Sequence, residues 1–134
     1  MEADRVLVVD DSPIARRQAR VAIEGEGIPV DEAATGAEAL TLSRAHRYTL
    51  ILSDYNMPAM NGLQLLAALR RVPGYANTPF FMITTELTRE LLAEGRAAGV
   101  KVWVVKPFEA PKLLRAVRTV MAAAASGSSA TGGE

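Results

Sequence analysis

The stretch Val6-Leu-Val-Val-Asp-Asp-Ser-Pro13 joins a short apolar run to two carboxylates and a helix-start signal. Four consecutive apolar residues are typical of a strand in a parallel sheet that is covered on both faces. Ser12 followed by Pro13 is typical of an N-cap residue with proline at the first helical position. The stretch therefore predicts a buried strand that brings Asp10 and Asp11 to its carboxyl end just before a helix begins.

The same succession of strand and helix recurs along the rest of the chain. Short apolar runs alternate with segments in which apolar residues recur every three or four positions. Strand–helix–strand units with short connections form right-handed crossovers and a parallel sheet. We therefore expect a five-stranded α/β fold. The predicted strands are Val6–Val9, Val30–Ala33, Leu50–Ser53, Phe80–Ile83 and Val102–Val105.

The predicted helices differ in the strength of their signals. The second, Ala37–Ala45, depends mainly on the helix propensity of Ala and Leu. The third should end near Pro73, because proline cannot continue a helix. The fourth, Thr88–Ala98, contains Gly95, which lowers helix propensity in the interior of a helix.

Length and composition restrict the protein to a few classes. The 134 residues predict one domain, which we place at residues 1–124, followed by a flexible Ser/Gly-rich tail or linker stub at 125–134. Fifteen Lys and Arg balance fifteen Asp and Glu, so the charge favours binding neither to nucleic acid nor to a membrane surface. The absence of cysteine excludes disulfides and thiolate chemistry. No apolar run could span a bilayer, and we expect a soluble cytoplasmic protein.

Polar side chains follow four of the five predicted strands. In an open parallel sheet, ligands bind beyond the carboxyl ends of the strands. Three carboxylates there repel one another, and a hard cation such as Mg²⁺ would neutralise them. Together with a hydroxyl and an ammonium group, they form a site suited to making and breaking an aspartyl phosphate. The alternative is that the first two Asp residues only cap a helix and the lysine only pairs with one of them. The residues are Asp10, Asp11, Asp54, Thr84 and Lys106.

These residues lie in motifs that resemble the receiver domains of two-component response regulators, and most of all the single-domain chemotaxis members. The resemblance covers roughly residues 5–121 and implies a flavodoxin-like, doubly wound (βα)5 sheet with strand order 2-1-3-4-5. The motifs are Val-Val-Asp10-Asp11-Ser-Pro, Ser-Asp54-Tyr-Asn-Met-Pro58-Ala-Met-Asn-Gly62, Met-Ile-Thr84-Thr and Val-Val-Lys106-Pro-Phe108.

The resemblance implies a role for each matching acidic residue. Asp54 would be the phosphoryl acceptor. Asp11 would bind Mg²⁺ directly, Asp10 largely through water, and Asp54 would complete the carboxylate ligands. Asn56 would add its backbone carbonyl to the metal.

The resemblance also implies a conformational switch. Thr84 and Lys106 would contact the phosphoryl group, and the bond before Pro107 would be a cis peptide. Trp103 stands where the family carries an aromatic residue that turns inward; alternatively, it is only a half-buried aromatic. The fourth predicted helix, fifth strand and fifth helix would then form the face that binds a downstream protein.

Other residues would adjust the chemistry or the partner surface. The resemblance implies that Asn56, Thr85 and Glu86 would influence attack of water on the phosphoryl group, although Glu86 equally suits an exposed carboxylate at a helix start. Arg16 and Arg17 are candidates for a surface that meets the kinase.

The sequence thus predicts a signalling switch, monomeric before phosphorylation, that takes a phosphoryl group from a histidine kinase and catalyses its own phosphorylation and dephosphorylation. Chemotaxis is one candidate pathway; the alternatives are a phosphorelay intermediate and a receiver fragment of a larger regulator. A haloacid-dehalogenase-type hydrolase would need an Asp-x-Asp motif and a cap, and a flavodoxin-type FMN binder would need a phosphate loop after the first strand. A degenerate receiver would lack part of the Asp, Asp, Asp, Thr, Lys set.

Overall fold

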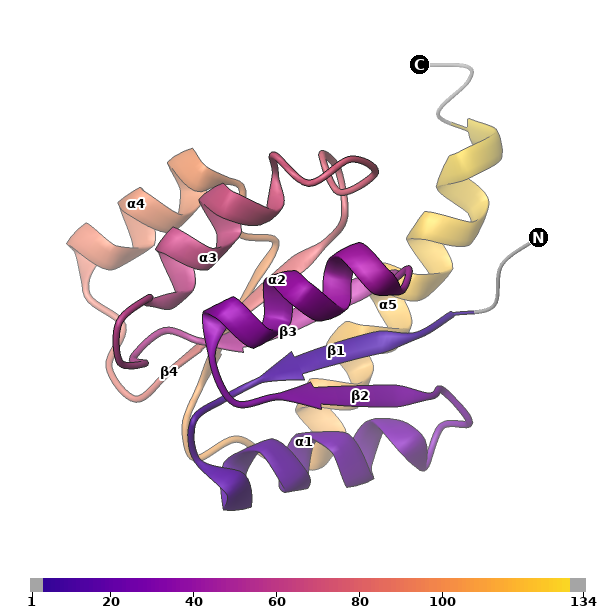
Figure 1. Ribbon diagram of the computed structural model, residues 1–134. Coiled ribbons are helices and arrows are strands. Elements are labelled where there is room, and N and C mark those ends of the chain that lie inside the picture. Colours follow the sequence, from indigo (N-terminus) through magenta and orange to yellow (C-terminus); the bar gives the residue numbers. More distant parts are fainter. Residues whose placement is uncertain (1–3, 131–134) are drawn as a thin grey trace.

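The computed structural model describes residues 4–130, with side chains described for 4–123. Within this range, five strands alternate with five helices (Figure 1). The elements are β1 (Val6–Val9), α1 (Pro13–Glu24), β2 (Val30–Ala33), α2 (Gly36–Ala45), β3 (Leu50–Asp54), α3 (Gly62–Leu69), β4 (Phe80–Thr84), α4 (Arg89–Ala98), β5 (Val102–Val105) and α5 (Ala110–Ala130).

The strands form one parallel sheet in the order β2-β1-β3-β4-β5. This order and the doubly wound (βα)5 architecture confirm the predicted fold. The order reverses at β1 and β3, where Val9 is in register with Ser53. The residues that follow this pair, Asp10 and Asp54, therefore leave the sheet side by side at its topological switch point.

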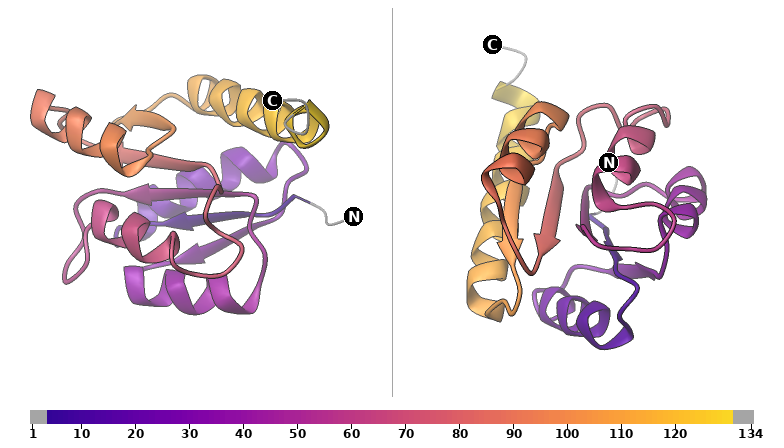
Figure 2. Two further views of the ribbon diagram at one scale, coloured as in Figure 1. Left: turned by 90° about the horizontal axis from the view of Figure 1, so that it is seen from above. Right: turned by 90° about the vertical axis from the view of Figure 1, so that its left-hand side faces the viewer.

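Helices cover both faces of the sheet, as the two views of Figure 2 show. One hydrophobic cluster joins the sheet to α2 and α3 and includes Leu7, Val9 and Ile51. The other joins the opposite face to α1 and α5 and includes Val6 and Val8. Successive residues of β1 thus point into different cores, which explains why the strand is apolar at every position.

Several element boundaries differ from the prediction. β3 and β4 each extend to include the polar residue after the apolar run, Asp54 and Thr84. α3 ends at Leu69, before Pro73, because the chain tightens into a turn in which the amide of Val72 bonds the carbonyl of Leu69 at 2.9 Å. Proline disfavours the α conformation only in the residue before it, here Val72, and the helix ends three residues earlier.

The carboxyl-terminal part of the chain is described only in part. α5 is helical to Ala130 and thus runs past residue 124, where the sequence predicts the domain to end. Residues 131–134 lie outside the described residues, so the tail remains a prediction. Within residues 4–130, no helix is both long and apolar enough to cross a membrane.

Candidate functional site

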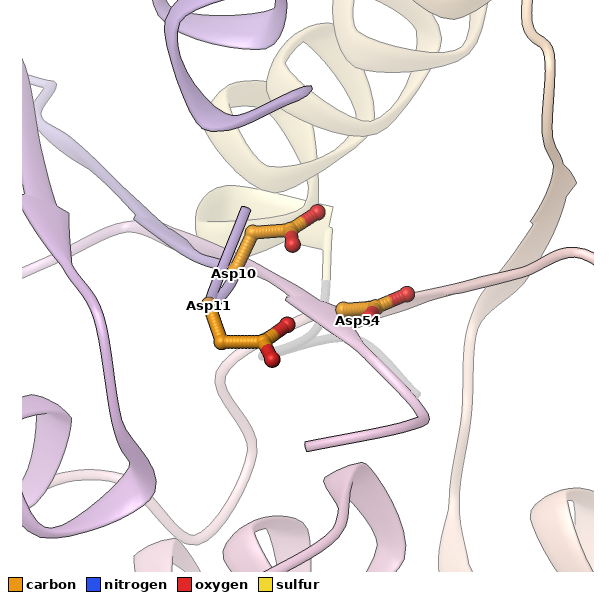
Figure 3. Close-up of side chains that lie close together, drawn as sticks. All are labelled: Asp10, Asp11 and Asp54. Atoms are coloured by element: carbon orange, nitrogen blue, oxygen red, sulfur yellow. The ribbon is translucent and has the colours of Figure 1, made fainter. Parts of the chain in front are cut away.

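Three carboxylates lie together where β1 and β3 end (Figure 3). Asp10, Asp11 and Asp54 each offer one oxygen within 4.8 Å of the others. Asp10 and Asp54 are buried, whereas Asp11 is exposed. The site therefore has two carboxylates held inside the fold and one at its mouth.

Main-chain and side-chain bonds fix the buried carboxylates. The amide of Ser12, the N-cap residue of α1, donates to Oδ1 of Asp10 at 2.9 Å. Lys106 Nζ lies 3.0 Å from Oδ2 of Asp10 and 3.2 Å from Oδ1 of Asp54. The amide of Lys106 donates to the carbonyl of Thr84 at 2.7 Å, and the bond to Pro107 is cis. One lysine thus bridges the two strand ends.

The charges of the site are not balanced by the protein alone. Burial and the neighbouring charge of Asp10 raise the pKa of Asp54 above its usual value, although Lys106 acts in the opposite direction. Burial alone would lower the pKa of Lys106, but its bonds to Asp10 and Asp54 raise it. Lys106 is therefore held in its charged form, while the surrounding carboxylates retain an excess of negative charge.

The donor set suits a hard divalent cation. Carboxylate oxygens are the ligands that Mg²⁺ prefers, and it commonly takes one or two of them plus water. The cluster of Asp10, Asp11 and Asp54 provides such oxygens from two neighbouring strand ends. Asn56, whose backbone carbonyl is the further predicted ligand, lies two residues after Asp54 in an exposed position.

The loop between β3 and α3 packs closely against the end of β3. A Cβ atom on Gly62 would lie 2.8 Å from the backbone oxygen of Asp54, so only glycine lets the chain approach this closely. Ala59 in the same loop has a φ of 69°, in the left-handed region. The presentation of Asp54 therefore depends on residues that follow it in the chain.

Thr84 is buried beside the site, but its hydroxyl is bonded elsewhere. It donates to the carbonyl oxygen of Glu86 at 3.0 Å and accepts from the amide of Glu86 at 3.2 Å. Thr85 and the side chain of Glu86 are exposed. The structure thus places the predicted Thr84 at the correct strand end with its hydroxyl turned toward the following loop.

Trp103 is half-buried on the face of the sheet that carries α4. A Cβ atom on Gly95 of α4 would lie only 2.2 Å from Cζ2 of the indole. Gly95, which weakens the helix signal in the sequence, therefore makes room for the ring. The available sequence signal was a glycine inside a predicted helix followed by one large aromatic residue on the next strand.

Beside the site, a groove of about 850 Å³ separates α1 from the loop that follows β5. Its lining includes Ile14 and Val21 of α1, together with Thr85 and Lys106. Ile14 is 74% exposed and Val21 is 53% exposed. Sequence reasoning did not identify this apolar groove, because it arises between segments far apart in the chain.

The first arginines of α1 differ in their surroundings. Arg17 is exposed and lines the groove. Arg16 bonds instead to Glu32 and to the backbone carbonyl of Asp10, both at 2.7 Å. Only Arg17 therefore remains a candidate for the expected partner surface.

Comparisons with known proteins agree with this arrangement. The response regulator receiver domain family matches residues 6–118. The chain is 32% identical to the chemotaxis protein CheY of Pseudomonas aeruginosa over 117 residues, which are 87% of this chain and 94% of that protein. It is 30% identical to the transcriptional regulatory protein SrrA of Staphylococcus aureus over 89% of this chain, but spans only 48% of SrrA.

A solved structure extends the likeness to three dimensions. The chemotaxis protein CheY4 of Vibrio cholerae superposes with a TM-score of 0.85 at 39% identity, over 89% of this chain and 99% of that one. The family match covers the segments that carry the acidic cluster, Thr84 and Lys106. The chain therefore belongs to the response regulator receiver domain family and is a CheY-like signalling domain.

Proposed function

We propose that this protein is a Mg²⁺-dependent switch that a histidine kinase activates by phosphorylating Asp54. The observation that carries the proposal is the meeting of three carboxylates and Lys106 at the carboxyl ends of β1, β3 and β5. When bound, Mg²⁺ would offset negative charge on the phosphoryl oxygens, with Asp10, Asp11, Asp54 and the Asn56 carbonyl as its protein ligands.

The chain's own residues would carry the transfer. A carboxylate oxygen of Asp54 attacks phosphorus, the bond from phosphorus to the kinase imidazole breaks, and the electron pair leaves with the imidazole nitrogen. Lys106 lies 3.2 Å from Asp54 and would pair with the phosphoryl oxygens. Hydrolysis of the aspartyl phosphate would reset the protein, with Asn56, Thr85 and Glu86 influencing the approach of water.

The new charge would change the conformation near β4 and β5. The hydroxyl of Thr84 would leave Glu86 and donate to the phosphoryl group. Trp103, which packs against α4 through Gly95, would respond to the space that Thr84 vacates. The face formed by α4, β5 and α5 would thereby change its affinity for a downstream protein.

Two surfaces would serve the two partners. The groove between α1 and the β5–α5 loop includes Lys106 in its lining, so a kinase helix that carries phosphohistidine would cover it while reaching Asp54. The likeness to CheY proteins favours a downstream partner in chemotaxis. The match to less than half of SrrA supports the alternative of a receiver within a larger regulator.

The intact mass of the protein after incubation with Mg²⁺ and acetyl phosphate tests the proposal. We expect one labile phosphoryl adduct on the wild type and none on Asp54→Asn. Removal of Mg²⁺ with EDTA should abolish the adduct. An adduct on Asp54→Asn, or none on a wild type that also fails with its kinase, would contradict the proposal.

A further inference from the structure

The side chain of Arg16 connects the acidic end of β1 to the edge strand β2. Its Nη1 donates to the backbone carbonyl of Asp10 at 2.7 Å, and its Nε donates to Oε1 of Glu32, also at 2.7 Å. Only 17% of the side chain is exposed. The planar guanidinium therefore makes these two bonds from two nitrogens held in a fixed relative orientation, a geometry that a lysine ammonium does not preserve.

The fold fixes both ends of this connection. The amide of Arg16 bonds the carbonyl of Ser12 at 2.9 Å in the first turn of α1, which sets where the side chain begins. Glu32 lies next to Asp31 in β2, and successive side chains of a strand point to opposite faces. Asp31 accordingly pairs with Arg5, while Glu32 meets α1.

The bond to the Asp10 carbonyl acts directly on the acidic pair. The amide of Asp10 already bonds the carbonyl of Ala33 at 3.1 Å, and its carboxylate accepts from the amide of Ser12. Arg16 fixes the remaining polar group of this residue, the carbonyl of the peptide that leads to Asp11. Since a peptide unit is planar, holding its oxygen also holds the starting direction of Asp11.

We propose that Arg16 is a positioning residue for the metal site: it holds the Asp10–Asp11 peptide in the orientation that lets both carboxylates bind Mg²⁺ together with Asp54. This inference rests on the proposed function, because that function places Mg²⁺ at the acidic cluster. Without Arg16, the peptide could rotate and the exposed carboxylate of Asp11 would spend less time near the other two. Groups that orient metal ligands commonly change metal affinity by roughly 10- to 100-fold when removed.

Arg20 offers a matched control on the same helix. It also pairs with Glu32, through Nε and Oε2, and with Glu24 at 3.2 Å. The bonds described for Arg20 do not include the Asp10 carbonyl. Removing either arginine takes one positive charge from Glu32, which by itself would favour a cation nearby. Only the loss of Arg16 also frees the carbonyl of the Asp10–Asp11 peptide from its hydrogen bond. The two substitutions therefore separate the effect of the lost charge from the effect of the lost positioning bond.

Calorimetric titration with MgCl2 near neutral pH tests the inference on wild type, Arg16→Gln, Arg16→Lys and Arg20→Gln. We expect the Kd for Mg²⁺ to rise roughly 10-fold in Arg16→Gln and to stay within about twofold of wild type in Arg20→Gln. The Kd of Arg16→Lys, which keeps the positive charge but loses the planar guanidinium, should lie between these two values. Thermal unfolding of each variant verifies that it is folded before titration.

Two further readouts distinguish positioning from a general loss of stability. Amide hydrogen exchange of residues 10–12, measured without Mg²⁺, should accelerate in the Arg16 variants and not in Arg20→Gln. Phosphorylation of Arg16→Gln by acetyl phosphate should be slow at limiting Mg²⁺ and approach the wild-type rate at saturating Mg²⁺.

The outcomes separate the inference from the function on which it rests. If Arg16→Gln binds Mg²⁺ as tightly as Arg20→Gln, the positioning role is wrong while the metal site stands. Arg16→Lys replaces Arg16→Gln in this comparison if Arg16→Gln does not fold. If the wild type itself binds no Mg²⁺, the proposed function fails and the inference fails with it.

Discussion

At the scale of single residues, Asp54 works against the stability of the fold that presents it. Its carboxylate is buried beside Asp10, and burial together with that charge raises its pKa. An acid whose pKa is raised on folding stabilises the folded state only while protonated, below its unfolded pKa. That contribution is lost as the pH rises through the folded pKa. Near neutral pH and without metal, this carboxylate is therefore a source of instability.

We predict that Asp54→Asn raises the resistance of the metal-free protein to urea at about pH 7, because it removes a buried charge. The gain should shrink as the pH falls through the raised pKa of Asp54, because the wild-type carboxylate then becomes protonated. Urea midpoints measured in EDTA across this range check the prediction. An Asn variant that is less stable than wild type at neutral pH would contradict it.

Asp31 provides the opposite control. Burial would raise its pKa, but hydrogen bonds from Tyr48 at 2.6 Å and Arg5 at 3.0 Å hold the pKa below its usual value. Its ionised form therefore stabilises the fold above the unfolded pKa, and this stabilisation is lost as the pH falls through the folded pKa. Asp31→Asn should destabilise the protein near pH 7 by an amount that decreases on acidification.

For single residues, the sequence predicts well which backbone positions come together at the edge of the sheet. It predicts poorly which hydrogen-bond partners their side chains find. Asp10, Asp54 and Lys106 follow apolar strands, and a parallel sheet brings such positions to one edge. The partners of Thr84 and Arg16 depend on side-chain rotation and reach, which spacing does not encode. Arg16 consequently suggested a partner surface, whereas the structure uses it internally.

At the scale of elements, α4 and β5 are matched through one small and one large residue. Gly95 of α4 leaves the space that the indole of Trp103 occupies. Because of this contact, a change in the conformation of Trp103 would change the position of α4. Both α4 and β5 belong to the proposed output face.

We predict that Gly95→Ala destabilises the protein by about 1–3 kcal/mol through overpacking, despite the better helix propensity of alanine. The emission of Trp103, the only tryptophan, should shift to the red as the ring is displaced toward solvent. In a Trp103→Phe background the smaller ring should relieve the clash, so that the same substitution becomes neutral or stabilising by up to about 1 kcal/mol. Urea unfolding of the four proteins measures this coupling, and equal effects in both backgrounds would show that the residues act independently.

The elements themselves were predictable because the spacing of apolar residues agrees with the positions of helix-capping and turn residues. β1, β2 and β5 have the predicted bounds, and Thr88 caps α4 with its side chain. The early end of α3 was missed because the chain tightens ahead of Pro73. The sequence predicts a tail from residue 125 because Ser and Gly are weak helix formers, whereas α5 is helical to Ala130. The tail itself stays a prediction.

At the scale of the whole molecule, input and output would use different surfaces around one site. The groove along α1, proposed for the kinase, includes Lys106 in its lining. Val105, the residue before Lys106 and the last of β5, is exposed on the proposed output face. The two surfaces therefore adjoin each other beside the acidic cluster, and Pro107 and Phe108 line both of them.

We predict that Ile14→Ser slows phosphoryl transfer from the histidine kinase about tenfold, because an exposed apolar contact in the groove is lost. Phosphorylation by acetyl phosphate, which needs no docking surface, should change by less than about twofold. Val105→Ser serves as the reciprocal variant: it should weaken binding of the downstream protein and leave transfer from the kinase intact. Equal slowing of both donors by Ile14→Ser would place its effect in the chemistry instead of in docking.

The bonds of Thr84 have a consequence for the whole signalling cycle. Its hydroxyl starts from a satisfied position, since it both donates to and accepts from the backbone of Glu86. A phosphoryl group that recruits this hydroxyl would make it exchange the backbone of Glu86 for the phosphoryl oxygens. Only the difference in free energy between these two hydrogen-bond arrangements would then shift the populations of the resting and activated conformations. A difference of about 1.4 kcal/mol changes their ratio tenfold. The main chain at Glu86 would thus set the background activity of the switch and return it to rest once the phosphoryl group is gone.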